Sequence, residues 1–304
     1  MRTLLNHQTF NIVLLFILSL LWGLHFSLVK IVDVEENPIT ILIPLLFILS
    51  ILFYLVLKIT NNIFLFSFKK TIFFIIAGTF AYIIPLYVEF LVAPKIDAGV
   101  LTLIVSSVPV FTLLFVWFFR LLDINFRLMI GTLSGLIGIS LIILGNNNNT
   151  LNLWLIMALI VPISYAIDTI FMEKFWPSKF NSLQVAYGEC VVSFILLLLL
   201  NVLIGDSWYG NINEFSKWIY MPNFWLLTIV TFFEVLLFFY ILAQAGAVFI
   251  NIGSYLVIPV GFFWGFIIFG ETFSLLKIIS TILVLISVIL IGNQNYKIKN
   301  TPIE

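Results

Sequence analysis

The segment from Asn223 to Phe269 reads NFWLLTIVTFFEVLLFFYILAQAGAVFINIGSYLVIPVGFFWGFIIF, about 47 residues with Glu234 as their single charged side chain. A helix needs about 20 apolar residues to cross the roughly 30 Å of hydrocarbon in a bilayer. The segment is too long for one crossing, even for a tilted helix. We therefore predict two membrane helices here, 223–243 and 247–269, divided at the polar and small residues from Gln244 to Gly246.

The whole chain shares the composition of this segment. Of its 304 residues, 62% are hydrophobic and 9% are charged, and the mean hydropathy is +1.21. A soluble domain carries about 25% charged residues, so this chain cannot cover a globule with a polar surface. The net charge of +0 gives no reason to expect a nucleic acid partner. The composition excludes a water-soluble globule and predicts a lipid bilayer as the surrounding medium.

Apolar runs long enough to cross a membrane occur along the whole chain, and polar residues separate nearly all of them. Runs of this length predict helices. The expected fold class is all-α, a polytopic membrane protein with ten transmembrane helices. The predicted helices are 11–31, 38–57, 71–91, 98–119, 128–145, 151–172, 183–204, 223–243, 247–269 and 275–292.

The asparagine run 146–149 divides the chain into two halves of five predicted helices each. We predict a first repeat over residues 1–145, a second repeat over 151–293, and a cytoplasmic tail over 294–304. An odd number of crossings per half places the two halves in the membrane with opposite orientations. This inverted arrangement is typical of transporters whose halves are related by an axis in the membrane plane.

Sequence matches between the two halves support the repeat. They join residues at equivalent places in corresponding helices. The matches are Ala93 with Ala243 and Pro109 with Pro259, and Trp22-Gly23 with Tyr165-Ala166, which sets His25 opposite Asp168.

The positions of the basic residues predict the orientation. On one side of the predicted membrane, the side of both termini, lie ten Lys and Arg residues, against four on the other side. Basic residues are enriched in cytoplasmic segments, so both termini are expected in the cytoplasm. The chain has 11 Lys against 3 Arg and is rich in Ile, Asn and Phe, which favours an AT-rich genome and a bacterial inner membrane.

Four carboxylic acids, Glu89, Asp168, Glu189 and Glu234, fall inside predicted helices. A charged side chain at the centre of a membrane helix costs about 3 kcal/mol, so it normally faces a cavity or a partner. No Lys or Arg lies well inside a predicted helix, so the four acids are expected to be hydrated, protonated or bonded to neutral polar groups. Glu89 and Asp168 lie near helix ends, where extension to the interface is the alternative interpretation. For Glu189 and Glu234 the alternative is a structural bond to a neighbouring helix.

The other candidates for a binding or translocation site are one histidine and several aromatic or amide side chains. His25 lies one turn after Trp22, and its ordinary pKa of about 6.5 suits a proton-linked switch, although a packed histidine is the simpler interpretation. The other candidates share a helix stripe with a polar residue or a proline. They are Trp22, Tyr82, Tyr165, Asn251 and Tyr255. Nothing resembles metal-ligand spacing, and no cofactor is expected.

Three stretches together resemble the EamA-type branch of the drug/metabolite transporter superfamily. They are Trp22 to Phe26 followed by Lys30, Ala98-Gly99 to Pro109, and Ala247 to Pro259 followed by Gly270-Glu271. The resemblance implies ten helices in two EamA repeats and a central cavity that moves small metabolites, often amino acids or related amphipathic compounds and frequently outward. Two family features are absent, the arginine early in the second helix (38–48) and the Gly-Glu pair that Arg120 to Asp123 replaces.

We therefore expect a secondary transporter that exports a small neutral or amphipathic, amino-acid-like metabolite by alternating access. Uptake or exchange of a nucleotide-type metabolite such as S-adenosylmethionine is the alternative within transport, and a non-transporting receptor or structural protein is the alternative class. An enzyme is not expected, because the sequence has no clustered catalytic motif. Protons as coupling ion, and a monomer or a homodimer, are left open.

Overall fold

The computed structural model describes residues 2–32, 37–64, 68–119, 125–144, 152–177, 180–204 and 217–292. The asparagine run, the replaced Gly-Glu position and the C-terminal tail lie outside these ranges. The elements are α1 (Arg2–Val32), α2 (Ile39–Ile59), α3 (Phe68–Gly78), the π-helix η1 (Thr79–Ile83), α4 (Ile84–Val92), the 3-10 turn η2 (Ala93–Lys95), α5 (Ala98–Val105), α6 (Val108–Phe118), α7 (Phe126–Leu144), α8 (Leu153–Ala158), α9 (Ile160–Phe175), α10 (Ser182–Ile204), α12 (Pro222–Phe269) and α13 (Leu275–Gly292).

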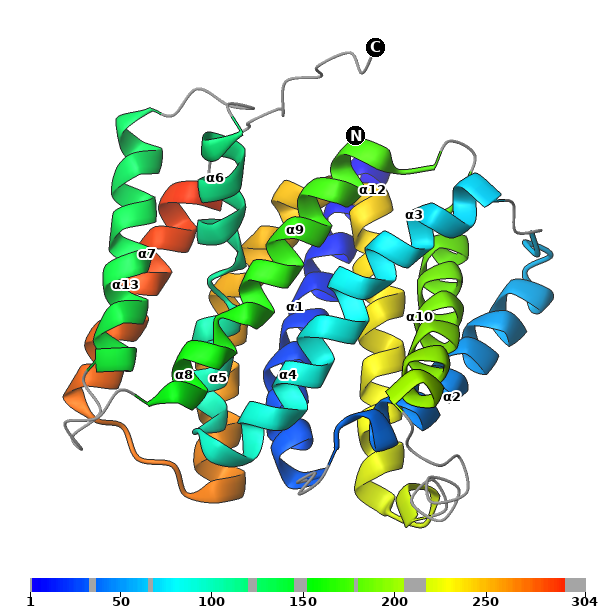
Figure 1. Ribbon diagram of the computed structural model, residues 1–304. Coiled ribbons are helices and arrows are strands. Elements are labelled where there is room, and N and C mark those ends of the chain that lie inside the picture. Colours follow the sequence, from blue (N-terminus) through cyan, green and yellow to red (C-terminus); the bar gives the residue numbers. More distant parts are fainter. Residues whose placement is uncertain are drawn as a thin grey trace.

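The fold is an all-helical bundle (Figure 1), and the described ranges contain no strand. Eight helices are long and apolar enough to cross a membrane, and two shorter apolar helices, Leu256–Phe269 and Leu275–Ile291, complete the set. Each of the ten predicted runs coincides with one of these helices. The predicted polytopic all-α membrane protein is confirmed.

The long helix α12 contains two crossings. Its backbone is helical from Pro222 to Phe269, about 70 Å if it were straight, which is twice the thickness of the hydrocarbon core. Contacts with α1 show that a first leg (222–242) and a second leg (250–269) run in opposite directions. These contacts are Trp22 with Phe238 and His25 with Glu234 on the first leg, and Ser19 with Gly253 and Gly23 with Val260 on the second. The two predicted helices are confirmed, but the expected division at 244–246 is a reversal of direction within helical backbone.

Corresponding helices of the two halves pack as antiparallel pairs. The second and seventh predicted helices, α2 and α10, meet through Phe47 with Phe194 and through Tyr54 with Tyr187. Antiparallel packing also joins the fifth and tenth predicted helices, α7 and α13. It likewise joins the fourth and ninth, α5 and the second leg of α12. Antiparallel packing of equivalent helices is what a two-fold axis in the membrane plane produces. The predicted inverted threading is confirmed, and the start of α1 and the end of α13 lie at the same end of the bundle (Figure 1).

Three glycines of α7 allow its close approach to α13, as their spacing predicts. A Cβ atom added to Gly135 would lie 2.6 Å from both Ser287 Oγ and Val110 Cγ2. Gly131 and Gly138 face the same helix at about 3.0 Å. Larger side chains at these positions would separate the two helices.

Three membrane crossings are interrupted near a proline, where the sequence predicted regular helices. In the third crossing Pro85 has no N–H to donate, and the π-helix η1 precedes it, with Ile84 N–H bonded to the Thr79 carbonyl. The fourth crossing is broken at Ser106-Ser107, just before Pro109, and the sixth at Leu159, three residues before Pro162. Both the π-helix and the break at Ser106 border the central cavity.

Candidate functional site

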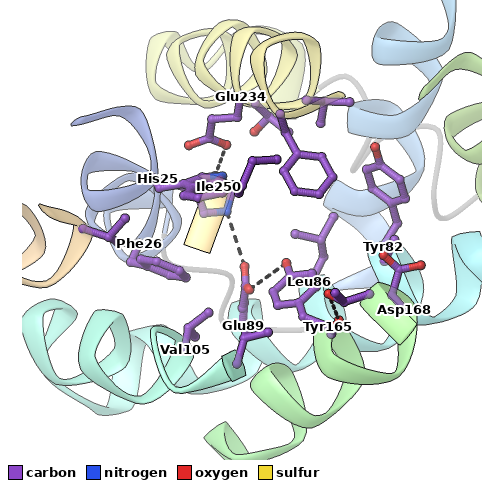
Figure 2. Close-up of a pocket in the computed structure, with 18 of the residues that line it drawn as sticks. His25, Phe26, Tyr82, Leu86, Glu89, Val105, Tyr165, Asp168, Glu234 and Ile250 are labelled. Atoms are coloured by element: carbon purple, nitrogen blue, oxygen red, sulfur yellow. Dashed lines mark hydrogen bonds and ion pairs between the residues drawn. The ribbon is translucent and has the colours of Figure 1, made fainter. Parts of the chain in front are cut away.

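A cavity of about 220 Å³ lies inside the bundle (Figure 2). Its wall combines side chains from both repeats, and it is mostly apolar with a few acidic and hydroxyl groups. It is lined by Trp22, His25, Phe26, Ala81, Tyr82, Leu86, Glu89, Val105, Ser106, Val108, Tyr165, Asp168, Thr169, Glu189, Thr231, Glu234, Val235, Phe238, Phe239, Ile250 and Val257.

Eight of the ten predicted site residues line this cavity. They are Trp22, His25, Tyr82, Glu89, Tyr165, Asp168, Glu189 and Glu234. The side chains of the other two, Asn251 and Tyr255, lie outside the described part of the structure. The structure thus brings the predicted side chains together from five crossings, while their role in binding stays a prediction.

Glu89 and Asp168, which lie near the ends of predicted helices, both line the cavity. Glu89 is 0% exposed, and both side chains face the cavity (Figure 2). The helical backbone does not end soon after Glu89, because α4 continues into the 3-10 turn η2.

His25 lies between two carboxylates. Its Nε2 atom is 3.3 Å from Glu89 Oε2, and its Nδ1 atom is 3.0 Å from Glu234 Oε2, within ion-pair distance although not aligned as a hydrogen bond. This pairing was not predicted from the sequence, where the four acids were expected to be hydrated, protonated or bonded to neutral polar groups. The available signal was that His25 is the one histidine inside a predicted membrane crossing, in a chain whose predicted crossings contain four acids and no central Lys or Arg.

A third side chain extends this network into the second repeat. The Tyr165 hydroxyl on α9 donates to Glu89 Oε1 at 3.1 Å. The contacts therefore run from α9 to α4, then to α1 and then to the first leg of α12. Because α1 and α4 belong to the first repeat and the other two helices to the second, the network joins the halves at two points.

The geometry fixes a minimum number of protons in the network. A neutral imidazole has one N–H, so its other nitrogen presents a lone pair to a carboxylate oxygen. At these distances an unprotonated nitrogen and a carboxylate oxygen repel each other whatever their alignment, so we expect each contact of His25 to hold a proton on one of its two atoms. Either His25 is an imidazolium between two carboxylates, or it is neutral beside one protonated acid. Both states leave the group of three with one net negative charge.

The other two acids, Asp168 on α9 and Glu189 on α10, line the same cavity without joining this network. Each has one buried oxygen without a hydrogen-bond partner in the described structure, Asp168 Oδ1 and Glu189 Oε1. The described residues contain no group of three or more His, Cys, Asp or Glu side chains that could hold a metal ion.

Polar lining residues that were not predicted from the sequence are Ser106, Thr169 and Thr231. The Ser106 hydroxyl is buried without a partner in the described residues, at the break between α5 and α6. The signal for it was the Ser-Ser pair before Pro109. Thr169 gave no such signal, because its hydroxyl donates to the Tyr165 carbonyl as an ordinary helical threonine does.

Two oppositely threaded helical halves around a central cavity with buried acidic groups are the architecture of a membrane transporter. The chain belongs to the EamA-like transporter family, whose model matches residues 9–144 and again residues 152–293. This match confirms the two EamA repeats. Nineteen chains of solved structures are similar to it. One crystal structure of a protein superposes on 93% of this chain and 97% of its own with a TM-score of 0.58, and at 14% identity this shows the fold alone. No curated protein sequence matches the chain.

Proposed function

We propose that the protein is a secondary transporter that exports a small amphipathic, amino-acid-like metabolite through the central cavity by alternating access. The observation that carries the proposal is a buried cavity, lined by both inverted halves, into which acidic, hydroxyl and aromatic side chains converge. Transporters of inverted design bind their substrates between the repeats and alternate by movement of one half against the other. The family membership supports transport as the activity.

The chemistry of the wall supports a substrate without phosphate. Among the described residues, no Lys or Arg lines the cavity, and these are the side chains that bind phosphate groups. Aromatic rings of Trp22, Tyr82 and Phe239 offer apolar surface beside the acids. A small metabolite with one apolar and one polar part fits such a wall. We place the chain in a bacterial inner membrane with both termini in the cytoplasm, on the distribution of its basic residues.

His25, Glu89 and Glu234 also support coupling to protons. The contacts of His25 depend on bound protons, and they join α1, α4 and the first leg of α12. Loss or gain of a proton would change the attraction between helices of the two halves. A protein that uses this network would transport faster with a proton gradient of the correct direction.

The test is to block the cavity with a matched pair of variants. Val235 and Ile229 lie on the same leg of α12, but Val235 lines the cavity whereas Ile229 is 48% exposed on the outside of the bundle. Proteoliposomes loaded with a mixture of isotope-labelled amino acids are expected to export at least one of them. Val235→Trp should reduce this flux to background, and Ile229→Trp should leave it within about twofold of the unaltered protein. Equal flux from both variants would rule out the cavity as the pathway.

A further inference from the structure

We propose that Asp168 and Glu189 form a subsite for the positively charged amine of the substrate, so that the cavity selects small organic cations over neutral molecules of the same shape. This inference rests on the proposed function, because it assigns the substrate class of the same cavity. The two proposals need different tests. The cation subsite can be tested by a binding measurement alone, whereas the proposed function requires a measurement of transport.

The first step is the balance of charge in the cavity. Four acids and one histidine line it, and no Lys or Arg does so among the described residues. His25 is the one basic side chain that lines the cavity among the described residues, and it already contacts Glu89 and Glu234. Asp168 and Glu189 have no cationic partner in the described structure. A buried carboxylate without a partner is costly, so the pair needs either protons or a cation from outside the chain.

The second step is the state of the side chains. Glu189 is 1% exposed, lines the cavity, and has an oxygen, Oε1, without a hydrogen-bond partner. Asp168, on α9, also lines the cavity and has an equivalent oxygen, Oδ1, without a hydrogen-bond partner in the described structure. An ammonium group carries up to three N–H donors and could satisfy both oxygens at once. These two acceptors in one cavity wall could therefore bind a positively charged donor of a ligand, since no such donor of the protein contacts them in the described structure.

The third step is the wall around the pair. Tyr82 lies beside Asp168, across the cavity from His25 (Figure 2), and lines the same cavity as both acids. Aromatic faces attract ammonium groups, with Trp the strongest and Tyr and Phe following. Trp22 and Phe239 line the same cavity and can hold the apolar part of the ligand. The described residues offer too few ligands for a metal centre, so an organic amine is the cation that the wall fits.

Two small probes of nearly equal shape test the proposal. Phenethylamine is a cation at pH 7, and 2-phenylethanol replaces its ammonium by a hydroxyl group. Their affinities for the purified full-length protein in an uncharged detergent can be measured by calorimetry and by quenching of tryptophan fluorescence. We expect phenethylamine to bind at least about tenfold more tightly than the alcohol, the ratio that one charge-assisted contact provides.

Three variants complete the experiment. Glu189→Gln and Asp168→Asn should each weaken phenethylamine binding about tenfold and change alcohol binding by less than about twofold. Glu173→Gln, an exposed position on α9 outside the cavity, is the matched control and should leave both affinities unchanged. Each variant is compared only after its elution profile and melting temperature match those of the unaltered protein. A variant that fails this check is replaced by Glu189→Asp or Asp168→Glu, which keep the charge and should keep the preference for the amine.

The outcomes separate the two proposals. Equal affinity for amine and alcohol, no detectable amine binding, or amine binding that both neutral variants leave intact would overturn the cation subsite, and would show that protons alone neutralise the pair. If the cavity-blocking variant still stops amino acid flux in that case, the transport proposal stands. Charge-dependent amine binding to a protein whose flux does not respond to the block would support the subsite and refute transport through this cavity.

Discussion

Glu271 of the second repeat contacts two helices of the first repeat, and Glu271→Gln tests how much this contact stabilises the fold. Glu271 follows α12, and its carboxylate accepts hydrogen bonds from Lys30 Nζ at 2.9 Å, from Ala98 N at 2.6 Å and from Gly99 N at 3.1 Å. Because Ala98 and Gly99 are the first two residues of α5, the carboxylate caps that helix. One side chain of the second repeat thus binds two helices of the first.

The magnitude follows from the burial of this contact. The side chain of Glu271 is 7% exposed and that of Lys30 is 18% exposed, so solvent screens the pair only in part. Breaking a buried ion pair by removing one partner costs about 3–5 kcal/mol. Glutamine keeps the shape and one acceptor oxygen, and Lys30 Nζ keeps its bond to the Ile96 carbonyl, so we expect a smaller loss of about 2–3 kcal/mol in the free energy of unfolding.

The assay is reversible unfolding of the purified protein in mixed micelles, followed by circular dichroism. Glu173→Gln is the control, because this exposed residue should change the free energy of unfolding by less than about 0.5 kcal/mol. Lys30→Met should cost less than Glu271→Gln, since Glu271 keeps two backbone N–H donors and the N-terminus of α5. The reasoning is refuted if Glu271→Gln unfolds like the control, or if Lys30→Met is the more harmful change.

Three further predictions concern the network and the packing of the repeats. Glu234→Gln should abolish the acceleration of transport by a pH gradient in proteoliposomes, and unchanged rates with and without the gradient would remove this residue from the mechanism. Tyr165→Phe removes the donor to Glu89 Oε1, so flux should fall about tenfold while the melting temperature changes little; undiminished flux would show that the bond is not used. Gly135→Leu should lower the free energy of unfolding by about 1–3 kcal/mol, because the new side chain meets Ser287 and Val110, and an unchanged denaturation curve would contradict the close packing of α7 and α13.

The apolar pattern was sufficient to predict the crossings, because membrane helices are set by the length and polarity of continuous runs. The same energetic argument selected Glu89, Asp168, Glu189 and Glu234, and all four line the cavity. The pattern placed two crossings in this segment, but it could not show that the chain reverses direction within the helical backbone of α12 rather than in a loop. Sequence reasoning also missed the interrupted helices, because proline indicates a break without fixing its form.

The pairing of His25 could not be predicted for a different reason. Its partner Glu89 is 64 positions away, and Glu234 is in the other repeat. Nothing local in the sequence distinguishes a histidine that bridges two acids from one that simply packs in a helix bundle. The missing information is which helix faces lie together, and the antiparallel pairing of the two halves supplies it.

The chemistry of this cavity depends on where the two repeats differ. At the spacing that matches Trp22 with Tyr165, His25 corresponds to Asp168, and Lys30 corresponds to the exposed Glu173. Two histidines at the equivalent positions would supply a basic group for each pair of acids, and no cation from outside would be needed. With an acid in place of the second histidine, the imidazole of His25 lies between Glu89 and Glu234, one carboxylate from each repeat. Asp168 and Glu189, both from the second repeat, lack a cationic partner in the described structure. The inverted repeat therefore builds the cavity, and the exchange of one basic group for an acid makes one side of it able to bind a cationic substrate.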